Sequence, residues 1–108
     1  MGTLYLKKDD LEPKFIATLR NADGTAVDLT NATSVSLIVK QQGGAKNFKS
    51  AGSFEDKPNG IVSYTWASGN TDTVGTFQIE WEVIWPTGRP ETFPSNGYDT
   101  LIVGASLD

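Results

Sequence analysis

The sequence predicts an all-β protein, a two-sheet antiparallel β-sandwich of about seven to eight short strands. Two observations indicate this fold. Apolar residues alternate with polar residues in several short runs, and turn-forming residues separate these runs about every 8–12 positions. No stretch shows the apolar period of a helix. With 108 residues the chain is long enough for a single domain, residues 1–108, with a core of its own, and a closed barrel is the alternative architecture.

The run at 75–86 is the strongest strand signal, and we expect it to lie at the centre of the core. Its large apolar residues occupy every second position and are Phe77, Ile79, Trp81, Val83 and Trp85. Burying each of them contributes about 1.5–3 kcal/mol, so this face requires a second sheet to pack against. Pro86 ends the run, and the turn that follows predicts a return strand through 91–93.

The other strand candidates follow from the same alternation. In chain order they are residues 3–6, 14–20, 26–29, 35–40, 47–50, 53–55, 61–66 and 98–103. Glycine-containing turns separate them, with Gly24 in one turn, Gly43 and Gly44 at the tip of a predicted hairpin, and Gly60 after a proline.

Composition argues against an enzyme and against a metal or cofactor site. The chain has no histidine and no cysteine, so it lacks the usual general base, the usual zinc ligand and any thiolate. We expect no cofactor. No apolar run reaches the roughly 20 residues of a membrane span, and the first residues lack the hydrophobic core of a signal peptide. We therefore expect a protein that is made and kept in a cytoplasm.

The charge distribution gives the first indication of partners. A net charge of −4 argues against nucleic acid. Residues 1–57 carry eight basic and seven acidic side chains, net +1, whereas residues 58–108 carry one basic and six acidic side chains, net −5. Such halves suit docking between copies or against neighbouring proteins, although ordinary solvated surface charge is the simpler interpretation.

Several short motifs, taken in their order and spacing, resemble a known family. They are Lys8, Asp10 and Pro13; Asp23-Gly24 and Val27-Asp28-Leu29-Thr30-Asn31-Ala32-Thr33; Gly60-Ile61-Val62, Tyr64 and Trp66; Asp72-Thr73, Gly75-Thr76-Phe77 and Glu80-Trp81-Glu82-Val83; and Phe93-Pro94 with Gly97-Tyr98. Together they resemble the immunoglobulin-like domain at the N-terminus of upper baseplate proteins of long-tailed phages, which also occurs as small free-standing phage structural proteins. The resemblance covers nearly the whole chain.

This resemblance implies an immunoglobulin-like sandwich and a non-enzymatic structural role in a virion assembled in the host cytoplasm. The implied partners are other virion proteins and further copies of the chain, with no nucleic acid and no membrane. Upper baseplate proteins continue into further domains, whereas this sequence ends at Asp108. Both a tail or baseplate position and a capsid decoration or head accessory role therefore stay open.

One position departs from the usual immunoglobulin-like pattern. Such domains often place a tyrosine at the corner leading into the central strand, where its hydroxyl bonds back to the chain. Here Phe77 follows that corner. We expect the carboxylate of Asp72 to accept backbone N–H groups from residues 73–75 instead.

The aromatic residues support an alternative function, a small carbohydrate- or surface-binding module, because flat rings stack on sugar faces. The four candidates are Trp66, Trp81, Trp85 and Tyr98. The alternation assigns Trp81 to the core, while Trp66 and Trp85 lie at strand ends where one of them can reach the surface.

The acidic residues do not form a recognisable metal or catalytic site. Calcium needs six to eight oxygen ligands at fixed positions, and neither the segment Asp9, Asp10 and Glu12 nor the pair Asn70 and Asp72 supplies enough of them. Glu80 and Glu82 are roughly 7 Å apart on one face of a predicted strand, a separation that can suit paired carboxylates. Ordinary surface charge explains all of these residues better.

Open sheet edges and one hairpin are the expected partner contacts. The predicted edge strands 3–6 and 100–103 carry no charge, and a neighbour can add a strand to such an edge. Leu101 and Val103 are the candidate contacts in the last strand. Lys40, Lys46 and Lys49 are the candidates in the hairpin, because they surround its Gly-Gly tip and can reach acidic neighbours.

Overall fold

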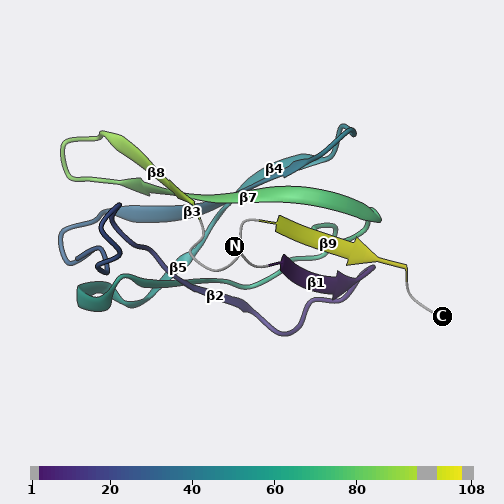
Figure 1. Cartoon of the computed structure of the whole chain (residues 1–108), viewed down its shortest axis with the longest axis horizontal. Coiled ribbons are helices and arrows are strands. Elements are labelled where there is room, and N and C mark those ends of the chain that lie inside the picture. Colours follow the sequence, from purple (N-terminus) through teal and green to yellow (C-terminus); the bar gives the residue numbers. More distant parts are fainter. Residues whose placement is uncertain (1–2, 95–99, 106–108) are drawn as a thin grey trace.

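The structure is a computed structural model that describes residues 3–94 and 100–105. Two packed sheets make up this part of the chain (Figure 1). The strands are β1 (Thr3–Lys7), β2 (Phe15–Thr18), β3 (Ser34–Gln41), β4 (Asn47–Ala51), β5 (Ser53–Asp56), β6 (Ile61–Tyr64), β7 (Gly75–Ile84), β8 (Pro90–Pro94) and β9 (Thr100–Gly104), with a 3₁₀ turn, η1, at Lys57–Asn59. The predicted all-β sandwich is confirmed, with nine strands in the described residues rather than seven or eight.

The larger sheet is built around β7, as the alternation in that strand predicts. Its order is β1-β9-β7-β3-β4, and β8 also pairs with β7. One edge of β7 carries β3 along most of its length. The other edge is shared, because β9 pairs with residues 75–78 and β8 with residues 80–84. The predicted return strand through 91–93 is confirmed as β8.

The pairing of β1 with β9 is parallel, with Thr3 opposite Thr100. The expectation of purely antiparallel pairing is therefore wrong for this one pair. Strands joined by a short hairpin must be antiparallel, but β1 and β9 come from opposite ends of the described chain, so no hairpin constrains their relative direction.

The smaller sheet has the order β2-β6-β5 and is antiparallel. In immunoglobulin-like domains strands B, E and D form one sheet, and G, F, C and C′ form the other. The strands β2, β6 and β5 correspond to the first set, and β9, β7, β3 and β4 to the second. Two features are additional: β1 joins β9 rather than β2, and β8 lies between strands F and G in sequence.

The core lies between the two sheets and is dominated by the inward face of β7. Phe77, Ile79, Trp81 and Val83 are at most 1% exposed. The ring of Trp81 lies 5.6 Å from that of Phe15 in the opposite sheet. Buried residues from the other strands and loops complete the core: Leu6, Ala17, Leu19, Val27, Leu29, Ala32, Val35, Leu37, Val39, Val62, Tyr64, Trp66, Phe93, Leu101 and Val103.

Trp85, the fifth residue of the predicted core face, lies at the rim. It is only partly buried against the core, because β7 ends at Ile84. Its indole N–H donates a hydrogen bond to Glu91 Oε1 at 3.0 Å. The predicted core face therefore extends through Val83 and not through Trp85.

Candidate interaction surface

Among the described residues, β1 forms one edge of the larger sheet and pairs with β9 on one side only, while β4 forms the edge at the other end of the strand order. Leu6 faces the core and is buried, whereas Tyr5 faces outward and is 70% exposed. Tyr5 lies opposite Ile102 of β9, so their side chains are neighbours on the outer face of the sheet. The prediction that residues 3–6 form an edge strand is confirmed.

A groove of about 360 Å³ lies beside this edge. The residues that matter for its chemistry are Tyr5, Lys7, Asp10, Glu12, Pro13 and Ile102. The connection from β1 to β2 forms one wall, and hydrogen bonds fix its course. Asp10 N–H donates to the carbonyl of Lys7 at 3.0 Å, and the Thr71 hydroxyl donates to the carbonyl of Asp10 at 2.9 Å. The lining of the groove thus combines apolar and charged side chains.

The charged groups at this groove form no ion pair within the described residues. The ion pairs in this part of the chain are Lys14–Glu55, Lys46–Asp72 and Lys49–Glu82. Asp10 and Glu12 are exposed and take part in none of them. Two carboxylates and one ammonium, that of Lys7, thus give the groove a net charge of −1.

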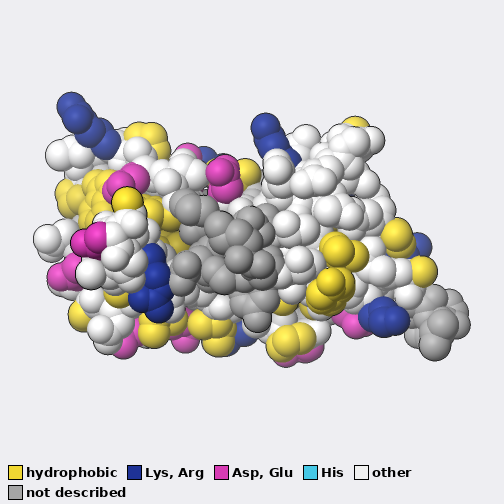
Figure 2. All heavy atoms as spheres, viewed as in Figure 1, with side chains coloured by type: hydrophobic (Ala, Val, Ile, Leu, Met, Phe, Trp, Pro, Cys, Tyr) yellow, Lys and Arg dark blue, Asp and Glu magenta, His cyan; other side chains and the backbone are white. Residues whose placement is uncertain are grey.

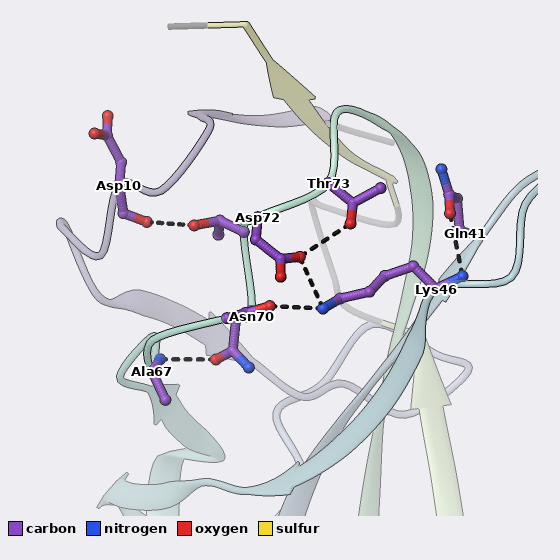
Figure 3. Close-up of polar contacts among 9 residues, drawn as sticks. Asp10, Gln41, Lys46, Ala67, Asn70, Asp72 and Thr73 are labelled. Atoms are coloured by element: carbon purple, nitrogen blue, oxygen red, sulfur yellow. Dashed lines mark hydrogen bonds and ion pairs between the residues drawn. The ribbon is translucent and has the colours of Figure 1, made fainter. Parts of the chain in front are cut away.

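Lys46 ties the β3–β4 hairpin to the loop that precedes β7 (Figure 3). Its ammonium donates to the carbonyl of Gly69 at 2.6 Å and to Asp72 Oδ1 at 3.0 Å. The Thr73 hydroxyl donates to the same carboxylate oxygen at 2.9 Å. The hydrogen bond from Lys46, followed by that from Thr73, lowers the pKa of the Asp72 carboxyl. Lys46 is therefore bound within its own chain.

These contacts also correct the expected role of Asp72. Its carboxylate accepts from the side chains of Lys46 and Thr73 rather than from the backbone of residues 73–75. A tyrosine closes the corner after all, from the preceding strand. The Tyr64 hydroxyl donates to Asn70 Oδ1 at 2.6 Å. The same oxygen accepts the Ala67 N–H at 2.7 Å (Figure 3).

The three lysines of the predicted hairpin site have different environments. Lys49 Nζ of β4 lies 2.5 Å from Glu82 Oε1 of β7, so this ion pair spans the intervening strand β3. Lys46 is held as described above. Lys40 is exposed and belongs to no ion pair among the residues that the structure describes. Two of the three charges are thus neutralised locally, and the expected cluster of free lysines reduces to Lys40.

The expectation of an open edge at residues 100–103 is wrong. β9 is an internal strand between β1 and β7, and Leu101 and Val103 are each 1% exposed with their side chains in the core. The alternation in this segment fits an internal strand as well as an edge strand. The pairing partner comes from the other end of the chain, so no local feature of the sequence indicates it. Part of the predicted strand 98–103 lies outside the described residues.

Of the two strand-end tryptophans, one of which was expected to reach the surface, Trp85 is partly exposed and Trp66 is buried. This side chain is 3% exposed, stacked on Phe15 at 6.4 Å and edge-on to Tyr64 at 5.2 Å. Its position two residues after Tyr64, on the same alternating face, is the signal that places it in the core. Trp85 is partly buried, and Tyr98 lies outside the described residues.

The acidic segments are solvent-exposed charge. Asp9, Asp10 and Glu12 are exposed, as is Glu80, while Glu82 pairs with Lys49. Residues 3–94 and 100–105 contain no group of three or more histidine, cysteine, aspartate or glutamate side chains that could hold a metal ion. Nor does this part of the chain contain a helix long and apolar enough to cross a membrane.

Hydrophobic side chains are distributed unevenly over the surface. On the face drawn in Figure 2 they gather at the end where the β7–β8 hairpin lies, and others are scattered over the region of β1 and β9. Among the described residues, the large apolar side chains that are most exposed are Tyr5, Leu11, Ile16 and Val74.

In comparisons with known proteins, no family model, curated protein or solved structure matches this chain.

Proposed function

We propose that this protein is a non-enzymatic structural component of a bacteriophage virion and acts through protein–protein contacts. Two positions in the particle fit the proposal, one in the tail or baseplate and one as a capsid decoration or head accessory. The resemblance of its motifs to the immunoglobulin-like domain of upper baseplate proteins supports the virion role. The immunoglobulin-like strand order is consistent with that resemblance.

The observation that carries the protein–protein part of the proposal is the free edge of β1 with its groove. An unpaired strand edge is a ready template for pairing with another chain, and soluble proteins usually protect it. Here the edge presents Tyr5 at 70% exposure, beside a groove whose carboxylates form no ion pair in the described residues. The groove thus offers a partner both apolar side chains and charged groups.

The alternative function, a carbohydrate- or surface-binding module, rests on Trp85. This ring is partly exposed and its N–H is held by Glu91 at 3.0 Å, a fixed orientation that can suit stacking on a sugar. Loss of glycan-array binding in a Trp85→Ala variant, with binding retained in Trp66→Phe, would favour this alternative.

Imaging of labelled particles tests the virion proposal. A fluorescent or gold-binding tag is fused to the chain, and particles are produced with the tagged protein in place of the native one. We expect the label on every particle, either over the head shell or at the tail. Label that remains in the unassembled fraction of the lysate, with bare particles, would refute the proposal.

A further inference from the structure

We propose that the chain associates head to tail with a second copy of itself, the tip of the β7–β8 hairpin in one copy occupying the groove beside β1 in the next. The tip is residues 86–90. The inference does not depend on the virion role, because it concerns two surfaces of the purified chain. If the chain does not associate with itself, the proposed virion role still stands, because a different virion protein can bind the β1 edge.

The hairpin tip is a defined, protruding and basic element. The backbone N–H of Trp85 donates to the carbonyl of Arg89 at 3.1 Å, and the backbone N–H of Gly88 donates to the carbonyl of Trp85 at 2.8 Å. Gly88 has a φ of +80°, which favours glycine at this turn. Arg89 and Pro90 are exposed, and Pro86 precedes them in the same turn. The tip therefore presents two proline rings and one guanidinium on a fixed backbone.

Arg89 is an exposed basic residue whose charge is available to an external partner. It is the only basic residue in residues 58–108, and its guanidinium takes part in no ion pair among the described residues. By contrast, Lys46 and Lys49 are paired within the chain. Lys7 lines the groove itself.

The groove is complementary to this tip in both chemistry and charge. Tyr5, Pro13 and Ile102 give it apolar surface that can pack against the prolines of the tip. Asp10 and Glu12 supply the carboxylates, and a guanidinium binds carboxylates through paired, charge-assisted hydrogen bonds. The groove's net charge of −1 leaves this attraction in place despite Lys7.

The two surfaces lie in different halves of an elongated molecule. The chain measures 44 × 25 × 24 Å, and Figure 1 shows the β7–β8 hairpin at one end, with β1 in the other half. A copy therefore cannot place its own tip in its own groove. A contact between two different surfaces is heterologous, and it generates either a closed ring or an open filament.

The contact is small, so it predicts weak association in solution. One hairpin tip would meet a groove lined by eight residues, far fewer than the roughly 20–30 residues that each side of a stable interface contributes. Weak heterologous contacts suit a repeating assembly, where each copy is held by several neighbours at once.

Sedimentation velocity over a wide concentration range, at low salt, tests the proposal. Wild type is expected to show reversible association that weakens as salt rises. Two variants remove it: Arg89→Glu in the tip, and Asp10→Lys with Glu12→Lys in the groove. Each should weaken association by at least about tenfold, the effect that two exposed ion pairs contribute together. Lys40→Glu and Glu80→Lys change exposed charges elsewhere and should leave association unchanged.

Mixing the two variants gives the decisive result. In an equimolar mixture, the acidic tip of the Arg89→Glu variant can bind the basic groove of the variant with Asp10→Lys and Glu12→Lys. The native tip of that second variant can bind the native groove of the Arg89→Glu variant. Association should therefore return to near the wild-type level, although each variant alone associates at least about tenfold more weakly. Thermal melts check that both variants remain folded. A wild type that stays monomeric at all concentrations, association that the variants do not change, or a mixture that fails to associate would each overturn the proposal.

Discussion

Replacing Trp81 by alanine is expected to be among the most damaging single changes in this protein. The side chain is 0% exposed and lies 5.6 Å from the ring of Phe15. A buried tryptophan removes about 150–250 Å² from water, and truncation of such residues to alanine typically costs about 3–5 kcal/mol. A Cβ added at Gly52 would lie 3.0 Å from the Trp81 ring. Because backbone borders the ring so closely, the cavity cannot collapse easily and the cost should be near the upper end.

A second variant separates packing from hydrogen bonding. The indole N–H of Trp81 is buried without a hydrogen-bond partner in the described residues, so no hydrogen bond is lost on substitution. An unpaired buried donor costs about 1–3 kcal/mol, and Trp81→Phe removes this donor together with part of the ring. The two effects oppose each other, so Trp81→Phe should destabilise by only about 1–2 kcal/mol.

Urea unfolding followed by circular dichroism measures both effects. With an m value of about 2 kcal/mol per M, a loss of about 4 kcal/mol lowers the midpoint by about 2 M. Trp85→Ala is the matched control, because this tryptophan is partly buried and lies at the rim; its loss should cost about 1 kcal/mol. The reasoning fails if Trp81→Ala unfolds within about 1 kcal/mol of wild type, or if the Trp85 variant is equally destabilised.

Three further results are expected. Gly60→Ala should lower the melting temperature more than Gly24→Ala, although both glycines have positive φ. A methyl group at Gly60 would lie 2.6 Å from a backbone carbonyl oxygen, whereas one at Gly24 would face open space. Equal losses of melting temperature would contradict this. Hydrogen bonds lower the pKa values of Asp72 and Glu55 in the folded protein. These carboxylates therefore stabilise the fold at pH values above their unfolded pKa values of about 4. That stability is lost as the pH falls through the lowered pKa values of the folded state. Asp72→Asn and Glu55→Gln should therefore reduce the loss of stability between neutral and acidic pH in urea titrations, and an unchanged pH dependence would refute the link. Lys46→Ala should speed amide exchange in residues 67–74 with little change in global stability, whereas unaltered exchange there would show that the lysine does not hold this loop.

The sandwich could be predicted because its information is local. The alternation from Phe77 to Val83 specifies a strand with one buried face, and the turn after Pro86 specifies the return strand. These signals involve neighbouring residues, so they can be read without knowing the tertiary structure. The strand boundaries were predicted less well, as the rim position of Trp85 illustrates.

The interaction surface could not be predicted to the same extent because it depends on residues far apart in sequence. Lys46 finds Asp72 across 26 positions, and no local pattern distinguishes a lysine with such a partner from a free one. Leu101 and Val103 are internal because β1 pairs beside them from the other end of the chain. The groove likewise combines residues of β1, β9 and the first connection. Only the free edge at residues 3–6 could be read from the sequence alone.

The central claim, that this is a structural protein of a phage particle, is tested most directly by counting it in the particle. Virions are purified through two independent steps, and the chain is quantified by mass spectrometry against isotope-labelled peptides, with a virion protein of known copy number as the internal standard. The account predicts many copies in each particle, retained through both steps. Fewer than one copy per particle, or a ratio that falls with each purification step, would contradict it.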